Sequence, residues 1–206
     1  MKANLLALFV VLISLTSLTA TAAPYPSHAG YPGNAPQISE PAAILKTGIS
    51  TLTAFLKSGG AQDRERAMAF LKAEIAPFFD FAYMTRWAAG PAWRRMGPEQ
   101  KAMMQEQLTS SFMTTLVQNL STYTNQPIRY FTPRGQSSND VNVRAWIMQP
   151  MGHPTKLEFR FYKSKDGWKI FDVKAAGNSA VVYYKKQFRH MFRYSDQNRP
   201  YNRPYN

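Results

Sequence analysis

The fold is decided by residues 140–175, DVNVRAWIMQPMGHPTKLEFRFYKSKDGWKIFDVKA, where apolar side chains recur at alternate positions over long runs. Alternation of this kind predicts strands with one buried face. Turn residues at Pro150-Met151-Gly152 and at Asp166-Gly167 divide the stretch, and one more strand-like run precedes it. The predicted strands cover residues 128–132, 140–149, 155–163 and 168–175. Because their connections are short, we expect antiparallel hairpins.

Upstream of the strands, the apolar period changes to that of a helix. The first predicted helix has Ser39 as its N-cap, ends at Gly59-Gly60 and carries one apolar stripe, formed by Leu45, Ile49, Leu52 and Leu56. Further helices are predicted from about Asp63 to Pro77, after the N-cap Asp80, from Pro98 to about Tyr123, and after the N-cap Ser179. Helices, a four-stranded antiparallel meander and a last helix predict an α+β fold with helices packed on one face of a curved sheet.

The two ends of the chain differ in composition from the middle. Residues 1–22 combine Lys2, an apolar run and the Ala20-Thr21-Ala22 pattern, which predicts a cleaved signal peptide and a soluble mature protein. The apolar run is shorter than the ~20 residues that span a bilayer, which argues against an uncleaved anchor. Residues 23–37 and 195–206 are rich in Pro, Gly and Asn and predict disordered tails around a single domain at 38–194.

The composition excludes several classes of protein. The chain has no cysteine, so neither a disulfide framework nor a thioether-linked lipid is available. Its 25 basic and 12 acidic residues give a formal net charge of +13. Basic charge together with aromatic residues is typical of nucleic-acid binders. An exported protein rarely meets nucleic acid, so the charge favours anionic lipid surfaces as the target.

No residue pattern indicates a catalytic or metal site. The three histidines, His28, His153 and His190, lack ligand spacing, and zinc-protease and phosphate-loop motifs are absent from the sequence. Asp80 and Asp172 are the candidates for an enzyme alternative, because a carboxyl group in apolar surroundings acts as a general acid or base. The structural alternatives are a helix cap for Asp80 and an ion pair for Asp172. We expect no cofactor.

Residues 79–96, FDFAYMTRWAAGPAWRRM, hold an unusual surplus of five aromatic rings and two methionines. On the short predicted helix, Phe81 and Met84 take one face while Trp87 takes the adjacent one. Apolar surface therefore covers most of the helix circumference. Such a helix is either buried in an ordinary core or lines a cavity, and the periodicity is compatible with both.

Two motif blocks lie far apart in the chain and in a fixed order. The first consists of Phe79-Asp80-Phe81, Met84, Gly90, Trp93-Arg94 and Pro98-Glu99-Gln100. The second consists of Gly167-Trp168-Lys169, Phe171-Asp172-Val173, Gly177, Ser179 and Tyr184. In this order they resemble the MlaC family, also called the toluene-tolerance family, and the likeness covers roughly residues 40–190.

The resemblance implies a periplasmic, non-enzymatic phospholipid carrier that supports outer-membrane lipid asymmetry. It implies a cone-shaped α+β fold, in which a curved four-stranded sheet and helices enclose an apolar pocket for acyl chains. It also implies two partners, an outer-membrane lipoprotein complex and an inner-membrane MCE-domain/ABC transporter complex. We expect a monomer. A hopanoid is an alternative ligand, and two further alternatives are a small enzyme with Asp80 or Asp172 in the pocket and a cationic surface binder without a cavity.

The chemistry of a carrier agrees with the apolar faces of the predicted strands and of the short helix. Two tails of about fifteen methylenes each cost on the order of 24 kcal/mol to expose to water, so a carrier must enclose them. The cavity candidates are Phe81, Met84, Trp87, Val143, Ile147, Leu157, Phe159, Phe161 and Val173. Contacts to a headgroup, or alternatively to a membrane or partner, are expected at the basic flank of the last helix, from Lys185, Lys186 and Arg189.

Overall fold

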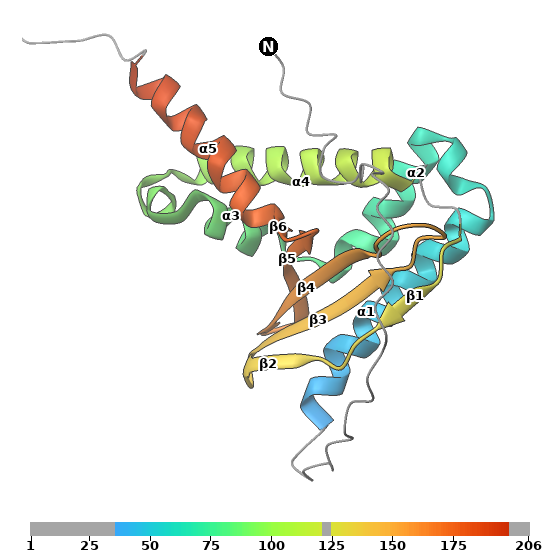
Figure 1. Ribbon diagram of the computed structural model, residues 1–206. Coiled ribbons are helices and arrows are strands. Elements are labelled where there is room, and N and C mark those ends of the chain that lie inside the picture. Colours follow the sequence, from blue (N-terminus) through green and yellow to red (C-terminus); the bar gives the residue numbers. More distant parts are fainter. Residues whose placement is uncertain (1–35, 121–124, 198–206) are drawn as a thin grey trace, which may run out of the picture.

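The computed structural model describes residues 36–120 and 125–197, which form an antiparallel sheet with helices around it (Figure 1). The helices are α1 (Pro36–Lys57), α2 (Arg64–Phe70), α3 (Phe81–Ala89), α4 (Pro98–Leu120) and α5 (Ala180–Gln197). The strands are β1 (Ile128–Tyr130), β2 (Arg134–Ser137), β3 (Asp140–Ile147), β4 (Thr155–Ser164), β5 (Gly167–Ala175) and β6 (Asn178–Ser179). Short helical turns occupy Gly60–Gln62, Leu71–Ile75, Ala76–Phe78 and Gly90–Arg95.

The sheet has the order β1-β3-β4-β5-β6, and β2 pairs with the part of β3 that β1 leaves free. Its ladders are antiparallel, as the short connections predict. The α+β fold and the four predicted strands are confirmed. Strands β2 and β6 were not predicted, because β2 lacks apolar alternation and β6 has only two residues.

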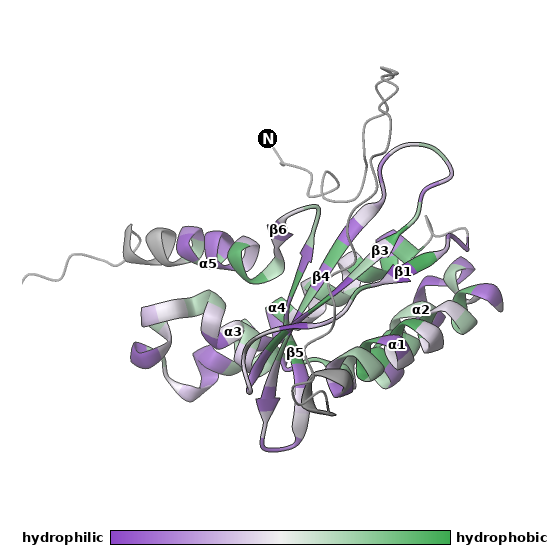
Figure 2. Ribbon diagram, turned by 60° about the horizontal axis from the view of Figure 1, so that its bottom comes forward, coloured by the Kyte–Doolittle hydropathy of each residue, from purple (hydrophilic) through white to green (hydrophobic). Residues whose placement is uncertain are grey.

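The helices contact both faces of the sheet, so the prediction that they pack on one face is wrong. Helix α1 covers the inner face, where Val141, Val143 and Phe161 are almost fully buried. Helices α3 and α5 pack together at the β5 end, against Phe171 and Tyr162. Successive residues of a strand point to opposite faces, so α1 and α3 lie on opposite sides of the sheet (Figure 2). Helix α4 runs from the α3–α5 group to α2 and joins the two sides (Figure 1).

Two predicted helix caps are confirmed and one is wrong. Asp80 Oδ1 accepts a hydrogen bond from the backbone N–H of Tyr83 at 2.8 Å. Ser179 Oγ accepts one from a backbone N–H in the first turn of α5 at 3.1 Å. Helix α1, in contrast, begins at Pro36, so Ser39 lies inside the helix and is not its N-cap. Proline suits the first helical position for two reasons. Its φ is already helical, and the backbone N–H that it lacks would have no acceptor within the helix at that position.

The chain between α1 and α3 turns sharply and brings aromatic rings under α1. A Cβ atom on Gly60 would lie 2.3 Å from the ring of Phe55, so this close approach requires glycine. The Phe55 ring stacks on Phe70 of α2, with ring centroids 3.9 Å apart. A π-helical turn and a 3-10 turn then replace the end of the single helix predicted up to Pro77. They place Phe78 against α1.

The helices extend beyond the predicted limits of the domain. Residues 36–37 and 195–197, predicted to belong to the tails, are helical. The predicted signal peptide, the rest of both tails and the predicted end of the long helix near Tyr123 lie outside the described residues. Within 36–120 and 125–197, no helix has the length and apolar content that crossing a membrane requires.

Candidate functional site

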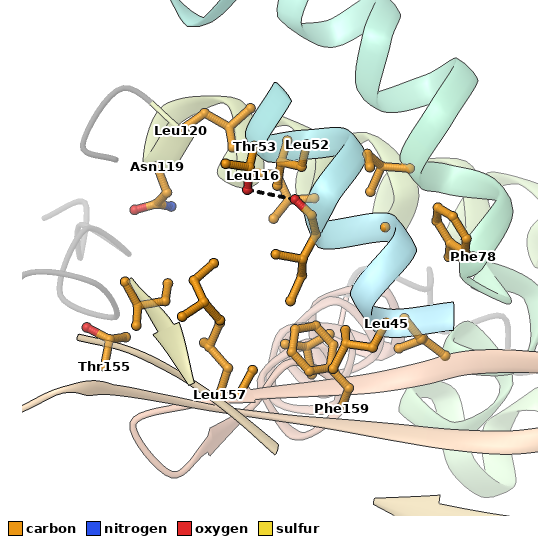
Figure 3. Close-up of a pocket in the computed structure, with 18 of the residues that line it drawn as sticks. Leu45, Leu52, Thr53, Phe78, Leu116, Asn119, Leu120, Thr155, Leu157 and Phe159 are labelled. Carbon is orange, nitrogen blue, oxygen red and sulfur yellow. Dashed lines mark hydrogen bonds between the residues drawn. The ribbon is translucent and has the colours of Figure 1, made fainter. Parts of the chain in front are cut away.

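An apolar cavity of about 250 Å³ lies between α1, the C-terminal half of α4 and the inner face of the sheet (Figure 3). Helix α1 contributes Ile44, Leu45, Gly48, Ile49, Leu52, Thr53 and Leu56. The sheet contributes Ile128, Ala145, Ile147, Thr155, Leu157, Phe159, Ile170 and Val173. The wall is completed by Ile75, Phe78, Phe79, Phe112, Leu116, Asn119, Leu120, Gln126 and Gln149.

Helix α1 lines the cavity with the apolar stripe that its sequence predicts. Leu45, Ile49, Leu52 and Leu56 occur at positions i, i+4, i+7 and i+11, which lie on one side of a helix. The opposite side of α1 is exposed, as at Lys46 and Ser50. On this side, a single helix, α1, therefore separates the cavity from solvent.

The polar side chains of the cavity gather at one end. In Figure 3, Asn119 and Thr155 lie at one end, while Leu45, Phe78 and Phe159 lie at the other. Asn119 Nδ2 donates to the Thr115 carbonyl at 2.6 Å, and a glutamine of the β3–β4 turn donates to Thr155 Oγ1 at 3.3 Å. Among the described residues that line the cavity, none is charged. The cavity thus has an apolar inner end and an uncharged, hydrogen-bonding outer end.

The polar end opens toward the surface. A neighbouring hollow of about 360 Å³ shares Ile49, Thr53, Gln126 and Ile128 with the cavity and adds the exposed Lys57 and the ring of Tyr130. From this opening inward, the cavity lining changes from uncharged polar side chains to apolar ones. We call this opening, at the shared residues, the cavity mouth.

Four of the nine predicted cavity residues line the cavity, namely Ile147, Leu157, Phe159 and Val173. Val143 and Phe161 share the inner face but are 1% and 0% exposed, because α1 packs directly on the sheet there. Phe81, Met84 and Trp87 do not line the cavity either. They belong to α3, which packs on α4, α5 and the outer side of β5.

The aromatic surplus of residues 79–96 packs mainly against other rings. Tyr83 stacks on Tyr162 with centroids 4.2 Å apart, and Phe81 stacks on Phe79 at 5.5 Å. Met84 is fully buried among them, whereas Trp87 is 48% exposed. The predicted alternative of an ordinary core therefore describes most of this helix. Phe79, just before α3, is the ring of this stretch that reaches the cavity.

The cavity residues missed by sequence analysis come mainly from α1, α4 and the turn before α3. The stripe of α1 and the i+4 repeat of Phe112, Leu116 and Leu120 were visible as apolar faces. Periodicity identifies a buried face, but it does not distinguish a face that meets another side chain from one that borders empty space. No sequence signal separates the two.

The predicted headgroup or partner contacts lie far from the cavity lining. Lys185, Lys186 and Arg189 are exposed on α5, and none of them lines the cavity. Helix α5 packs on α3 and on β5 through Val181 and Phe188, so its basic flank faces solvent on the other side of the molecule from α1.

The two candidate acids have structural partners outside the cavity. Asp172 is 1% exposed and accepts hydrogen bonds from Ser179 Oγ at 2.7 Å and from a backbone N–H of α5 at 3.1 Å. The predicted ion pair of Asp172 is present, with Arg160 at 3.9 Å. Asp80 caps α3 and also accepts from the Tyr162 hydroxyl. Burial, and then this hydrogen bond, raise the pKa of Tyr162, so the phenol stays protonated as the donor.

The described residues also contain no cluster of three or more His, Asp and Glu side chains that could hold a metal ion. Asp80 and Asp172 serve as helix caps, and Asp172 is also an ion-pair partner. The geometry around the cavity supports apolar binding rather than acid–base chemistry.

Comparison with known proteins agrees with this geometry. A family model described as MlaC protein matches residues 46–199. Among solved structures, a phospholipid-binding protein from Ralstonia solanacearum, determined in complex with a phospholipid, matches with a TM-score of 0.68 and 28% sequence identity, over 75% of this chain and 88% of that chain. A comparison with curated proteins finds no match. Because the family model spans well over half of the sequence, this protein belongs to the MlaC family.

Proposed function

We propose that this protein is a phospholipid carrier whose cavity between α1 and the sheet holds acyl chains. The observation that carries the proposal is the cavity itself, which has an apolar inner end and no charged residue among the described residues of its lining. Membership of the MlaC family supports the proposal. So does the similar Ralstonia solanacearum protein, which was solved with a phospholipid bound.

The lining has the chemistry that acyl chains require. Each methylene that leaves water gains ~0.8 kcal/mol, so a carrier gains most by enclosing whole chains. A charged wall would lose its hydration when a chain entered, at a large cost. The described lining avoids this cost, because its polar members are uncharged amides and hydroxyls. The zwitterionic or anionic headgroup then stays in water.

The cavity has to widen to hold a two-chain phospholipid. Its volume of about 250 Å³ lies below the roughly 300–1,000 Å³ that is typical of ligand pockets. We infer that α1 moves away from the sheet as chains enter, because α1 is a single exposed wall that joins the next turn through Gly59 and Gly60. Loaded protein should show slower amide hydrogen exchange in α1 than stripped protein. Identical exchange in both states would contradict this inference.

The proposal extends to a periplasmic shuttle. The predicted signal peptide and membership of the MlaC family support export to the periplasm. The resemblance to the family implies the outer-membrane lipoprotein complex and the inner-membrane MCE-domain/ABC transporter complex as lipid donor and acceptor. The positions of the two candidate acids support a carrier without enzymatic activity, because Asp80 and Asp172 both cap helices outside the cavity. Cell fractionation with site-specific crosslinking tests the shuttle, and recovery of the mature chain in the cytoplasm would contradict it.

Native mass spectrometry of the mature protein tests lipid binding directly. The protein is purified without detergent, washed in high salt, and its lipids are extracted and identified. We expect one stoichiometric phospholipid to survive the wash, because salt screens exposed charge but does not release a buried chain. An empty mass after reconstitution with several lipids would contradict the proposal, and a bound hopanoid would redefine the cargo.

A cavity-filling variant sharpens this experiment. Leu157→Trp places a large side chain in the cavity wall and is expected to lower the lipid content severalfold. Val182→Trp makes the same kind of change at a side chain that is 51% exposed on α5, and it should retain the lipid. Circular dichroism and thermal melting verify that both variants fold. Equal lipid content in the two variants would contradict the assignment of the site.

A further inference from the structure

Cations and aromatic rings cluster on the outer face of the sheet, at the end where the cavity opens. We call Arg129, Phe131, Arg144, Trp146 and Lys156 the rim patch. The rings of Phe131 and Trp146 pack with centroids 4.5 Å apart. Arg129 and Arg144 lie over the Phe131 ring at 5.2 and 5.4 Å, and Lys156 lies over the Trp146 ring at 5.1 Å. The rim patch thus presents aromatic surface flanked by three positive charges.

The rim patch and the cavity mouth lie on the two faces of the same end of the sheet. Ile128, Ile147 and Thr155 line the cavity and form one rung across β1, β3 and β4. Successive residues of a strand point to opposite faces. The next rung therefore points outward, and it consists of the rim-patch residues Arg129, Trp146 and Lys156. Along each of these strands, the patch residue is therefore the immediate neighbour of a lining residue.

Little negative charge offsets the rim patch. Among the described residues from Gln126 to Lys156, the one acidic residue is Asp140. Asp140 stands at the far end of β3, seven residues from Ile147 along the same strand. Glu158 of β4 stands opposite Arg144 in the β3–β4 ladder, but its carboxylate forms an ion pair with Lys174 at 2.7 Å. The patch therefore attracts anionic groups.

The β3–β4 turn adds an apolar tip to this end of the sheet. Met151 in this turn is 90% exposed, and Figure 2 shows the connection between β3 and β4 projecting beyond the strands. Gln149 and Thr155, on either side of the turn, line the cavity. An exposed apolar side chain at the same end of the sheet as a group of basic residues has the chemistry of segments that insert at the boundary between headgroups and acyl chains.

We propose that the rim patch and Met151 dock the protein on the surface of an anionic phospholipid bilayer, with the cavity mouth held at the headgroup layer. Cation–π contacts stabilise the two rings, but they do not explain an exposed methionine at the same end. Aromatic rings favour the membrane interface, and basic side chains are attracted to anionic lipid. The inference rests on the proposed function, because a mouth held at a bilayer serves a cavity that takes acyl chains.

Vesicle flotation of the mature full-length chain tests the docking. Vesicles of equal parts phosphatidylglycerol and phosphatidylcholine are compared with vesicles of phosphatidylcholine alone. The wild-type protein should bind the anionic vesicles more tightly. The variant R129Q/R144Q/K156Q should bind them on the order of a hundredfold more weakly, since each basic residue near an anionic surface contributes roughly fivefold. Met151→Ser should weaken binding by a smaller factor.

A matched control removes the same number of charges from α5. The variant K185Q/K186Q/R189Q should bind anionic vesicles like the wild-type protein. Equal losses in the two triple variants would show attraction by overall charge and would overturn the proposal, as would failure of the wild-type protein to bind. Equally tight binding to beads coated with polyglutamate, unaffected by Met151→Ser, would assign the patch to an acidic protein and overturn the assignment to lipid.

The lipid content of the same preparations separates this inference from the proposed function. None of the three substituted residues of the rim patch lines the cavity, so this variant should carry as much phospholipid as the wild-type protein. Retained lipid would also show that the variant folds. Vesicle binding by protein that never carries lipid would contradict the proposed function, whereas loaded protein that ignores anionic vesicles would contradict the docking alone.

Discussion

The two sides of the sheet are built from similar apolar side chains but are filled differently. On the α3–α5 side, Met84 and Phe188 are at most 1% exposed, and Tyr83 and Tyr162 stack at 4.2 Å. On the α1 side, part of the inner face borders a cavity of about 250 Å³, and Phe159 there is only partly buried. Ring-rich helices interlock with the rings of the strands they cover. Helix α1 instead presents leucines, isoleucines and Gly48, which leave space.

This difference shows that the position of empty space depends on the covering helix more than on the strands. An unfilled apolar cavity forgoes dispersion contacts and costs stability. The apolar cavity and its cost lie on the side of α1, while the α3–α5 side carries a closely packed group of rings. The following experiments test this division, from the largest expected effect to the smallest.

Truncating one ring on each side should have clearly unequal costs. Phe188→Ala removes a ring that is 1% exposed, and it should lower the free energy of unfolding by about 3–5 kcal/mol. Phe159→Ala should cost roughly half as much, because its ring already borders empty space and is partly exposed. Urea unfolding of lipid-stripped protein measures both. Equal costs would break the comparison between the two sides.

Alkaline pH should lower the free energy of unfolding through a residue of the α3–α5 side, Tyr184. Burial raises the pKa of Tyr184 to about 12, while its hydrogen bond to Ser111 acts in the opposite direction. The unfolded phenol ionises near pH 10, so the contribution of Tyr184 is fully present below pH 10 and is lost as the pH rises toward 12. The loss amounts to about 3 kcal/mol.

The variant Tyr184→Phe isolates this effect. Its free energy of unfolding should fall less steeply between pH 10 and 12 than that of the wild-type protein. Some slope should remain, because burial and the Asp80 carboxylate also raise the pKa of Tyr162. An unchanged slope would show that Tyr184 ionises without penalty and is less enclosed than the structure indicates.

Gly60→Ala should disturb the turn that follows α1. Its Cβ would lie 2.3 Å from the Phe55 ring, which would have to leave its stack on Phe70. We expect a loss of about 1–3 kcal/mol, typical of overpacking. Gly97→Ala is the matched control, since no atom lies within 4 Å of its Cβ position. A neutral Gly60→Ala in thermal unfolding would mean that the turn after α1 accommodates the added methyl group without strain.

Asp80→Ala should have the smallest effect and separate a carrier from an enzyme. Loss of the N-cap of α3 should cost about 0.5–2 kcal/mol. Lipid content should be unchanged, because Asp80 does not line the cavity. Tyr162→Phe, which removes only the hydroxyl that donates to Asp80, serves as the control. Loss of bound lipid from stable Asp80→Ala protein would show that this carboxylate takes part in binding.

The sheet and most helix limits could be predicted because local rules determine them. Alternation along 140–149 and 155–163 predicted the strands, and capping chemistry predicted the starts of α3 and α5. The start of α1 was missed because Ser39 has the chemistry of an N-cap, whereas Pro36 begins the helix. Both residues satisfy a local rule for a helix start, and the sequence alone did not rank them.

The cavity could be predicted only in part. Alternation correctly placed Ile147, Leu157 and Phe159 on the same face as Val143 and Phe161. It could not show where along that face α1 lifts away from the sheet. That position depends on contacts between segments distant in sequence, such as Gly48 of α1 beside the ring of Phe78. The rings of α3 were wrongly predicted to line the cavity for the same reason, since the rings that they pack against lie on β4, β5 and α4.

Photocrosslinking tests the central claim most directly, by comparing the two sides in one experiment. Benzoylphenylalanine replaces Phe159, which lines the cavity, or Trp87, which lies on α3 outside it. Both positions carry an aromatic ring in the native chain. After irradiation of detergent-free protein, we expect the Phe159 variant to gain the mass of one phospholipid and the Trp87 variant to gain none. A lipid adduct at Trp87, or none at Phe159 in lipid-loaded protein, would contradict the account.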